Sequence, residues 1–171
     1  RLKLPCLVRA LRYTRIGAPP RGYAASGTHI SVGTEHVAKW GNWHAGDNKA
    51  RFSGRYTADQ PSIIEPFLPG DVVRVLMIGE RAWQIDMSGD DWLKSASHAD
   101  AAISTDVNVD LLADTQAVKM GFGLDIIGND YIVAPDGTPH LLEVNHMPEV
   151  THFPILWAAY RDTVLGWLQN E

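Results

Sequence analysis

Alternating apolar and polar residues near the end of the chain predict a β-hairpin. Residues 131–134 form an apolar run, and residues 141–145 alternate apolar with polar side chains, which is typical of a strand with one buried face. Between them, residues 135–139 combine proline, aspartate and glycine, the composition of a turn, so the two strands should pair antiparallel. Glu143 and Asn145 would then point the same way, about 6.6 Å apart at roughly 3.3 Å per residue.

The remaining pattern in the second half predicts another hairpin and two helices. Residues 71–79 and 82–87 are predicted strands joined by a tight turn at residues 80–81. Apolar spacing over residues 110–120, followed by Gly-Phe-Gly, indicates a helix, and residues 155–169 are expected to form an amphipathic helix. Antiparallel hairpins mixed with helices predict an α+β protein.

The first half shows weaker periodicity. Residues 3–11 look like a strand, whereas glycines and prolines punctuate residues 14–54, which we expect to be a mobile loop. Residues 62–68 form an apolar strand broken by Pro66, and the proline suggests an edge strand or a bend. Residues 96–108 are small and polar and are expected to be a loop.

The hairpin at the end of the chain carries side chains that could bind a metal ion. Asp130 precedes its first strand, and Glu143 and Asn145 share a face of its second strand. Two carboxylates and an amide suit a hard divalent cation such as Mg²⁺, which usually also contacts substrate phosphates. The same residues could instead form a solvated strand face. The upstream aspartate and the closing Pro148 favour the metal site.

Composition limits the possible classes of function. The chain has 171 residues, a net charge of −5 and 45% hydrophobic residues, enough for one domain or two small lobes. The acidic balance and the lack of a basic run argue against nucleic acid as a partner. A single cysteine, Cys6, cannot form an internal disulfide, which favours the cytoplasm. No apolar stretch is long enough for a transmembrane helix.

These residues resemble the ATP-grasp family of nucleotide-dependent ligases. The family pattern is Gly-x-Asp, an apolar strand, a glycine turn, and then apolar-x-Glu-x-Asn-x-x-Pro. This chain carries the pattern as Gly128-Asn129-Asp130, residues 131–133, Asp136-Gly137 and Leu141-Leu142-Glu143-Val144-Asn145-His146-Met147-Pro148. The phrase Leu-Leu-Glu-Val-Asn-His is also similar to tubulin-tyrosine-ligase-like enzymes of the same superfamily. The resemblance covers most of residues 63–150.

The resemblance implies a two-lobed α+β ATP-grasp domain with antiparallel sheets and flanking helices. A glycine-rich lid lobe would occupy residues 1–66, and a core lobe that binds metal and nucleotide would occupy residues 67–171. The implied cofactors are ATP and Mg²⁺, and the implied reaction activates a carboxylate as an acyl phosphate for attack by an amine. The substrates would be small-molecule or peptide carboxylates and amines, with neither nucleic acid nor a membrane as partner.

The family also implies a further domain. ATP-grasp ligases usually carry another domain before this region, and the sequence begins at Arg1 rather than at methionine. We therefore expect the chain to be a piece of a longer protein whose substrate domain is missing here. The site would be completed by the rest of that protein or by an oligomer partner.

The resemblance assigns roles to the predicted metal ligands and to two cations. Asp130, Glu143 and Asn145 would hold Mg²⁺ against the ATP phosphates. Arg74, on a strand facing the active site, and Lys94 would be the catalytic cations. For Arg74, a structural salt bridge is the alternative. Lys94 would supply a charge that many family members carry as an arginine at the end of the second strand.

The nucleotide contacts implied by the family lie earlier in the chain. Arg9 stands where the family has a phosphate-binding lysine, although it could simply flank a strand end. The backbone around Glu65 would read the adenine edge, and Phe67 and Leu68 would contribute to the apolar sandwich around the ring. Asp71, at the start of the next strand, completes the predicted nucleotide-binding set.

Departures from the family pattern keep other functions open. Arginine replaces lysine at position 9, and the second arginine is absent near residues 86–87. These departures favour a nucleotide-binding module without ligase activity, with a regulatory or scaffold role. A plain structural α+β domain is the third possibility. Turnover of ATP with an added amine would separate the first two, and binding of ATP or Mg²⁺ would exclude the third.

Overall fold

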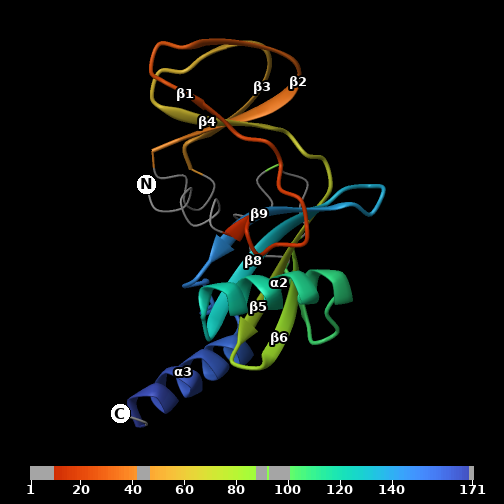
Figure 1. Cartoon of the computed structure of the whole chain (residues 1–171), viewed down its shortest axis with the longest axis vertical. Helices are drawn as coiled ribbons and strands as arrows, with labels where there is room; N and C mark the ends of the chain where they lie inside the picture. The colour runs from red at the N-terminus through yellow and green to blue at the C-terminus, as the bar shows by residue number, and fades with distance from the viewer. Residues whose placement is uncertain (1–9, 42–46, 88–91, 93–100, 170–171) are drawn as a thin grey trace.

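The computed structural model describes residues 10–41, 47–87, 92 and 101–169. Within these residues, the chain forms two antiparallel β-sheets and two long helices (Figure 1). The first sheet uses residues 22–66, and the second uses residues 71–145. The predicted α+β class with antiparallel sheets and flanking helices is confirmed.

The first sheet has the strand order β1-β4-β2-β3. Its strands are β1 (Gly22–Ala24), β2 (His29–Trp40), β3 (Lys49–Thr57) and β4 (Ser62–Pro66). The prediction of a loop over residues 14–54 is therefore wrong. Glycines concealed the strands: Gly33 lies where the β2–β3 register shifts, and Gly54, opposite Val32, has a φ of 75°. These positions interrupt the period of two on which strand recognition depends.

Of the two alternatives predicted for Pro66, an edge strand and a bend, the edge strand is wrong. β4 lies between β1 and β2 in the sheet. The proline is tolerated because β1 pairs only with residues 62–64, so no strand on that side needs a donor at position 66. Backbone pairing with β2 continues at the next residue, because the N–H of Phe67 donates to the carbonyl of Glu35 (2.9 Å).

The second sheet has the strand order β7-β6-β5-β8-β9. Its strands are β5 (Asp71–Ile78), β6 (Arg81–Met87), β7 (Ala102–Ser104), β8 (Ile126–Val133) and β9 (Pro139–Asn145). Both predicted hairpins, β5–β6 and β8–β9, are present. The first turn falls at residues 79–80, one residue earlier than expected. β7 lies within the predicted loop over residues 96–108, and three residues are too few to show a strand period.

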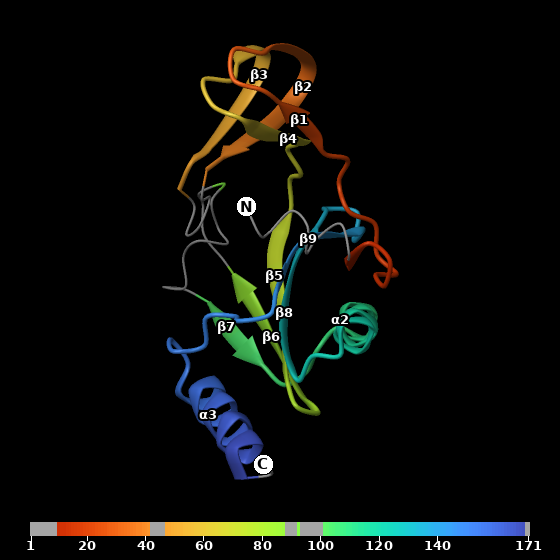
Figure 2. The same cartoon turned by 60° about the vertical axis from the view of Figure 1, so that its left-hand side comes forward.

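Helices α2 (Val109–Phe122) and α3 (Pro154–Gln169) agree with the two predicted helices. Helix α2 begins after Asn108, whose side chain accepts hydrogen bonds from the N–H groups of Asp110 and Leu111, and ends at Gly123 in the left-handed conformation. The two helices lie on opposite faces of the second sheet (Figure 2). Each covers its own apolar core, so this sheet is buried on both faces.

Residues 10–17 pack against the second sheet, although they precede the first in sequence. The hydroxyl of Thr14 and the N–H groups of Arg15 and Ile16 donate to the buried carboxylate of Asp114 on α2 (2.7, 2.5 and 3.1 Å). The carbonyl of Gly17 accepts a hydrogen bond from Leu141 N–H (2.9 Å) on β9. Because β9 is an edge strand, this segment covers part of its open side.

Gly121 on α2 is required by the packing of Tyr13. A Cβ atom built at position 121 would lie 2.3 Å from the Tyr13 ring, far inside van der Waals contact. We expect Gly121→Ala to destabilise the protein by about 1–3 kcal/mol, because the ring has to move out of its packed position. The check is the free energy of unfolding from denaturant titration.

Gly166→Ala on α3 is the matched control. A Cβ atom at this position would meet nothing within 4 Å. Alanine should therefore gain about 0.4–1 kcal/mol from its lower unfolded-state entropy. If both alanines shift stability in the same direction, the clash at Tyr13 has no energetic importance.

A buried polar cluster joins α2 to β8 beneath this segment. The Tyr131 hydroxyl donates to Asp114 Oδ2 (2.7 Å), accepts from Asn129 Nδ2 (3.0 Å) and lies 2.9 Å from the Thr115 hydroxyl. Tyr131 is fully buried. Burial, together with the charge of Asp114, raises the pKa of Tyr131 well above its usual value near 10.

Tyr131→Phe should destabilise the protein by about 1–3 kcal/mol, because it leaves buried polar partners unpaired. It should also weaken the dependence of stability on alkaline pH. The folded protein keeps the Tyr131 proton while the unfolded chain loses it near pH 10, so this contribution is complete below about pH 10 and declines above it. Unfolding followed from pH 8 to 11 checks both effects. Tyr23→Phe, at an exposed tyrosine, is the control and should match the wild type.

Candidate functional site

Three neighbouring strands bring Arg74, Asp130 and Glu143 into one row across the second sheet. Arg74 on β5 pairs with Asp130 on β8, and Asp130 pairs with Glu143 on β9. Asn145 pairs with Gly128, two residues along the same strand, and therefore points to the same face. The three residues predicted to bind metal and the predicted catalytic arginine thus share one face of the sheet.

Arg74 and Asp130 form a buried bidentate ion pair. Arg74 Nε donates to Asp130 Oδ1 (2.6 Å) and Nη2 donates to Oδ2 (2.9 Å). The two residues are 7% and 4% exposed. Burial alone lowers the pKa of Arg74, but the carboxylates of Asp130, Glu143 and Glu149 outweigh it and raise the pKa above its ordinary value. Arg74 therefore remains charged at every accessible pH.

The structural salt bridge that the sequence left open for Arg74 is present. The partner of Arg74 is Asp130, which is itself a predicted metal ligand. Both Asp130 oxygens accept hydrogen bonds from Arg74, yet each carboxylate oxygen has a second lone pair. With Glu143 and Asn145, the row offers two carboxylates and an amide, and Arg74 offsets one negative charge. This donor set fits a hard cation that also shares anionic ligands such as phosphates.

A second charged cluster lies on the first sheet around Glu65. This carboxylate, 4% exposed, forms ion pairs with Lys39 on β2 and with Arg21, whose Nε lies 2.7 Å from Glu65 Oε2. Arg21 Nη2 also donates to the carbonyl of Leu142 on β9 (3.0 Å). One buried carboxylate thus meets two cations, and one of those cations reaches the second sheet.

Sequence reasoning missed both Lys39 and Arg21. Lys39 could have been found, because it follows Val37 by two residues and so shares that residue's buried face of the strand. Arg21 stands between Pro20 and Gly22, and nothing in the local sequence indicates its partners. Glu65 was expected to act through its backbone, whereas in the structure its carboxylate makes the ion pairs.

The other predicted nucleotide residues lie at or just beyond the junction between the two sheets. The Phe67 ring lies beneath the guanidinium of Arg51, with 3.7 Å from Cζ to the ring centroid. Leu68 is half-buried, and Asp71 is exposed at the start of β5. Two predicted residues, Arg9 and Lys94, lie outside the described part of the chain.

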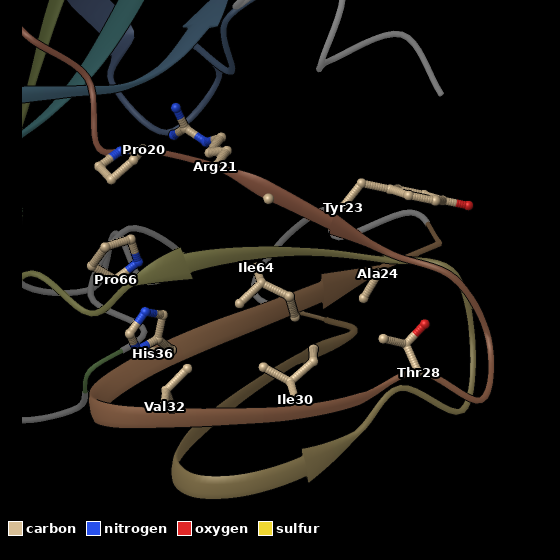
Figure 3. Close-up of a pocket in the computed structure, with 11 residues that line it drawn as sticks. Pro20, Arg21, Tyr23, Ala24, Thr28, Ile30, Val32, His36, Ile64 and Pro66 are labelled. Atoms are coloured by element: carbon tan, nitrogen blue, oxygen red, sulfur yellow. The ribbon is translucent and has the colours of Figure 1, made fainter.

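A pocket of about 440 Å³ opens within the curl of the first sheet (Figure 3). Ile64 and Pro66 of β4 line it together with apolar residues of β2, and His36 lies at one end. Glu65 falls between these two pocket residues in the strand, so its carboxylate lies on the opposite face. The pocket therefore lies on the face opposite the Glu65 carboxylate, although Arg21 of the charged cluster contributes to its lining.

In the described part of the chain, no group of three or more His, Cys, Asp or Glu side chains is arranged to hold a metal ion by itself. At the row, the Asn145 amide and external ligands such as phosphates would complete the coordination of a cation. None of the helices in the described part of the chain is both long and apolar enough to cross a membrane.

Comparison of the sequence with protein-family models and with curated proteins gives no match. Comparison of the structure gives several. The macrocyclase MdnC from Microcystis aeruginosa MRC, bound with precursor peptide MdnA, matches 95% of this chain and 60% of its own, with TM-score 0.60 and 15% identity. The ATP-grasp ligase PsnB, complexed with a variant of its minimal precursor, Mg and ADP, matches 93% and 58%, with TM-score 0.58 and 18% identity.

A third match extends the likeness beyond peptide-bound enzymes. The ADP complex of PurK, N5-carboxyaminoimidazole ribonucleotide synthetase, matches 86% of this chain and 45% of its own, with TM-score 0.64 and 8% identity. The chain thus spans about 60% or less of the length of these proteins. Taken with the two antiparallel sheets, the flanking helices and the row on β5, β8 and β9, these matches identify the protein as one with an ATP-grasp-like fold.

Proposed function

We propose that this protein is an ATP- and Mg²⁺-dependent ligase that activates a carboxylate as an acyl phosphate for attack by an amine. The observation that carries the proposal is the row Arg74, Asp130 and Glu143 on three adjacent strands, with Asn145 on the same face. Two carboxylates, an amide and a permanently charged arginine are the groups needed to bind a magnesium-nucleotide complex.

Each group has a distinct task in this proposal. Asp130, Glu143 and Asn145 hold Mg²⁺, which when bound offsets negative charge on the phosphates. Arg74 holds Asp130 in place and keeps the local charge balanced. On the first sheet, the ion pair of Lys39 and Glu65 lies beside the bound nucleotide. The junction around Phe67 and Leu68 contacts the base. Arg9, Asp71 and Lys94 remain proposed contributors to phosphate binding and catalysis.

A peptide is the substrate class that we favour. MdnC and PsnB were both crystallised with precursor peptides, and their fold is shared by this chain. The carboxylate would then be a peptide side chain or terminus, and the amine would come from the same or a second molecule. Because the chain spans only part of these proteins, we propose that another domain or an oligomer partner completes the peptide site. We place the reaction in the cytoplasm, where a protein with one cysteine needs no disulfide.

The test measures ADP release and amine incorporation together. Wild-type protein, and any longer protein that contains this chain, is incubated with ATP, Mg²⁺, a glutamate-containing peptide and an amine, with EDTA as the negative control. We expect ADP to form only with Mg²⁺ and to rise with the peptide, and we expect the product to have lost one water relative to its substrates. If ADP does not form under any of these conditions, the ligase proposal fails.

One observation favours a second function, a nucleotide-binding module without turnover. Both oxygens of Asp130 already accept hydrogen bonds from Arg74, so the metal must share this carboxylate with a tightly held cation. Such a site can bind a magnesium-nucleotide complex without proceeding to transfer. Calorimetric binding of ATP with Mg²⁺, in the absence of any ADP release, would establish this function in place of the ligase.

A further inference from the structure

Arg21 is a side chain that connects the two sheets. Its Nε donates to Glu65 Oε2 on β4 (2.7 Å), and its Nη2 donates to the carbonyl of Leu142 on β9 (3.0 Å). The Arg21 side chain is 12% exposed and that of Glu65 is 5% exposed, so both contacts are shielded from water. Such contacts are stronger and more specific in orientation than those of surface arginines.

The residue that Arg21 holds on β9 is a bulge. Tyr131 pairs with Leu141 and Asp130 pairs with Glu143, so Leu142 falls between the two pairs as an extra residue. The burial pattern agrees, because Leu141 and Val144 both lie in the core against α2 although they are three residues apart. A regular strand would place them on opposite faces.

The bulge decides where Glu143 points. If the register at Tyr131 and Leu141 continued without it, Leu142 would lie opposite Asp130, and Glu143 would lie opposite Asn129 on the face that packs against α2. The carboxylate would then enter an apolar core instead of joining the row. The extra residue is therefore the structural condition for having Asp130 and Glu143 side by side.

We propose that Arg21 is a positioning residue for Glu143: by holding the Leu142 carbonyl, it fixes the β9 bulge that sets Glu143 opposite Asp130. The inference rests on the proposed function, in which Glu143 binds magnesium. Arg21 acts through the backbone, by way of the Leu142 carbonyl. Because it is also bound to Glu65, the position of the first sheet is coupled to that of the metal carboxylate.

Arginine is suited to this task, and lysine is not. The planar guanidinium presents donors in two fixed directions, toward Glu65 and toward Leu142, whereas an ammonium is a single point of charge. Arg21→Lys therefore keeps the cation beside Glu65 and removes the span to β9. Arg55→Lys, at an exposed arginine on β3, is the matched control.

The first measurement needs no ligand. Amide hydrogen exchange is followed in wild type, Arg21→Lys and Arg55→Lys, with attention to residues 141–145. We expect faster exchange confined to these residues in Arg21→Lys and wild-type exchange in Arg55→Lys. Unchanged exchange at 141–145 overturns the proposal. Exchange raised evenly over both sheets, with a lowered melting temperature, also overturns it, since Arg21 would then be a general structural residue.

The second measurement tests the coupling to Glu143. Arg21→Lys should lower the magnesium-dependent affinity for ATP by about 10- to 100-fold, the usual cost of removing a group that orients a metal ligand. In a Glu143→Gln background, the same substitution should cause no further loss, because the carboxylate it positions is gone. If Arg21→Lys lowers the magnesium-dependent affinity further in the Glu143→Gln background, the proposal is overturned. If wild type binds no magnesium-ATP, the proposed function fails, and the exchange experiment alone decides the role of Arg21.

Discussion

Arg74→Met is expected to destabilise the protein by about 3–5 kcal/mol, the usual cost of breaking a buried ion pair by removing one partner. The substitution keeps the length of the side chain but leaves the Asp130 carboxylate buried without its bidentate partner. Val72 and Leu76 flank position 74 on the same face and belong to the core against α3, so little water can reach the orphaned charge. Denaturant titration of wild type and variant gives the difference in free energy of unfolding.

The double variant Arg74→Met, Asp130→Leu is the control for this prediction. With both charges removed, the apolar pair should recover most of the lost stability, since buried ion pairs are often no more stable than apolar residues of similar size. It should not recover magnesium-dependent nucleotide binding. A loss below about 1 kcal/mol in the single variant would mean that water already solvates the Asp130 carboxylate, and the view of a dry ion pair would be wrong.

Glu143→Gln is expected to lower the magnesium-dependent affinity for ATP by about a hundredfold or more. Even groups that only orient metal ligands cost about 10- to 100-fold when they are mutated, and Glu143 is a proposed ligand. Glutamine preserves the shape of this half-buried side chain, so the fold should be retained. Calorimetric titration of ATP at fixed Mg²⁺ and in EDTA isolates the magnesium-dependent part of the affinity.

Two further variants sharpen this result. Glu80→Gln removes a carboxylate from the exposed turn after β5 and should bind like the wild type. Asn145→Asp should bind the metal nearly normally but bind the phosphates less well, because it adds a charge beside an anion. If Glu143→Gln binds magnesium-ATP as tightly as the wild type, β9 presents only a solvated face, and the ligase proposal fails with it.

Local patterns predicted the second sheet well because its strands are signalled by residues close together in sequence. The turn over residues 135–139 indicated the β8–β9 hairpin, and Glu143 and Asn145 do share a face. The predicted alternation of apolar and polar residues explains this shared face only in part. Strict alternation would have put Leu141 on that face too, whereas the bulge sends it to the opposite core. A bulge changes the side-chain phase without a distinctive residue type at Leu142, so the sequence does not reveal it.

Long-range pairings limited what could be predicted of the candidate site. Arg74 was expected to face either the active site or a structural partner, and that partner is Asp130, 56 residues away. The contact between Arg21 and Glu65 spans 44 residues and depends on strand pairings in the first sheet that were not foreseen. Pairwise side-chain contacts of this kind follow from sheet register, which local composition does not encode.

The path of residues 10–17 has a consequence for how the two sheets can move. Since this segment is bound to α2 and β9, the chain leaves the second sheet at residues 18–21 and returns to it at residues 67–70. The first sheet is therefore an insertion within the second unit, tethered at two points. A body held by two tethers swings about the line that joins them and cannot twist freely about a single linker. Opening and closing over the row on β5, β8 and β9 should thus follow one arc.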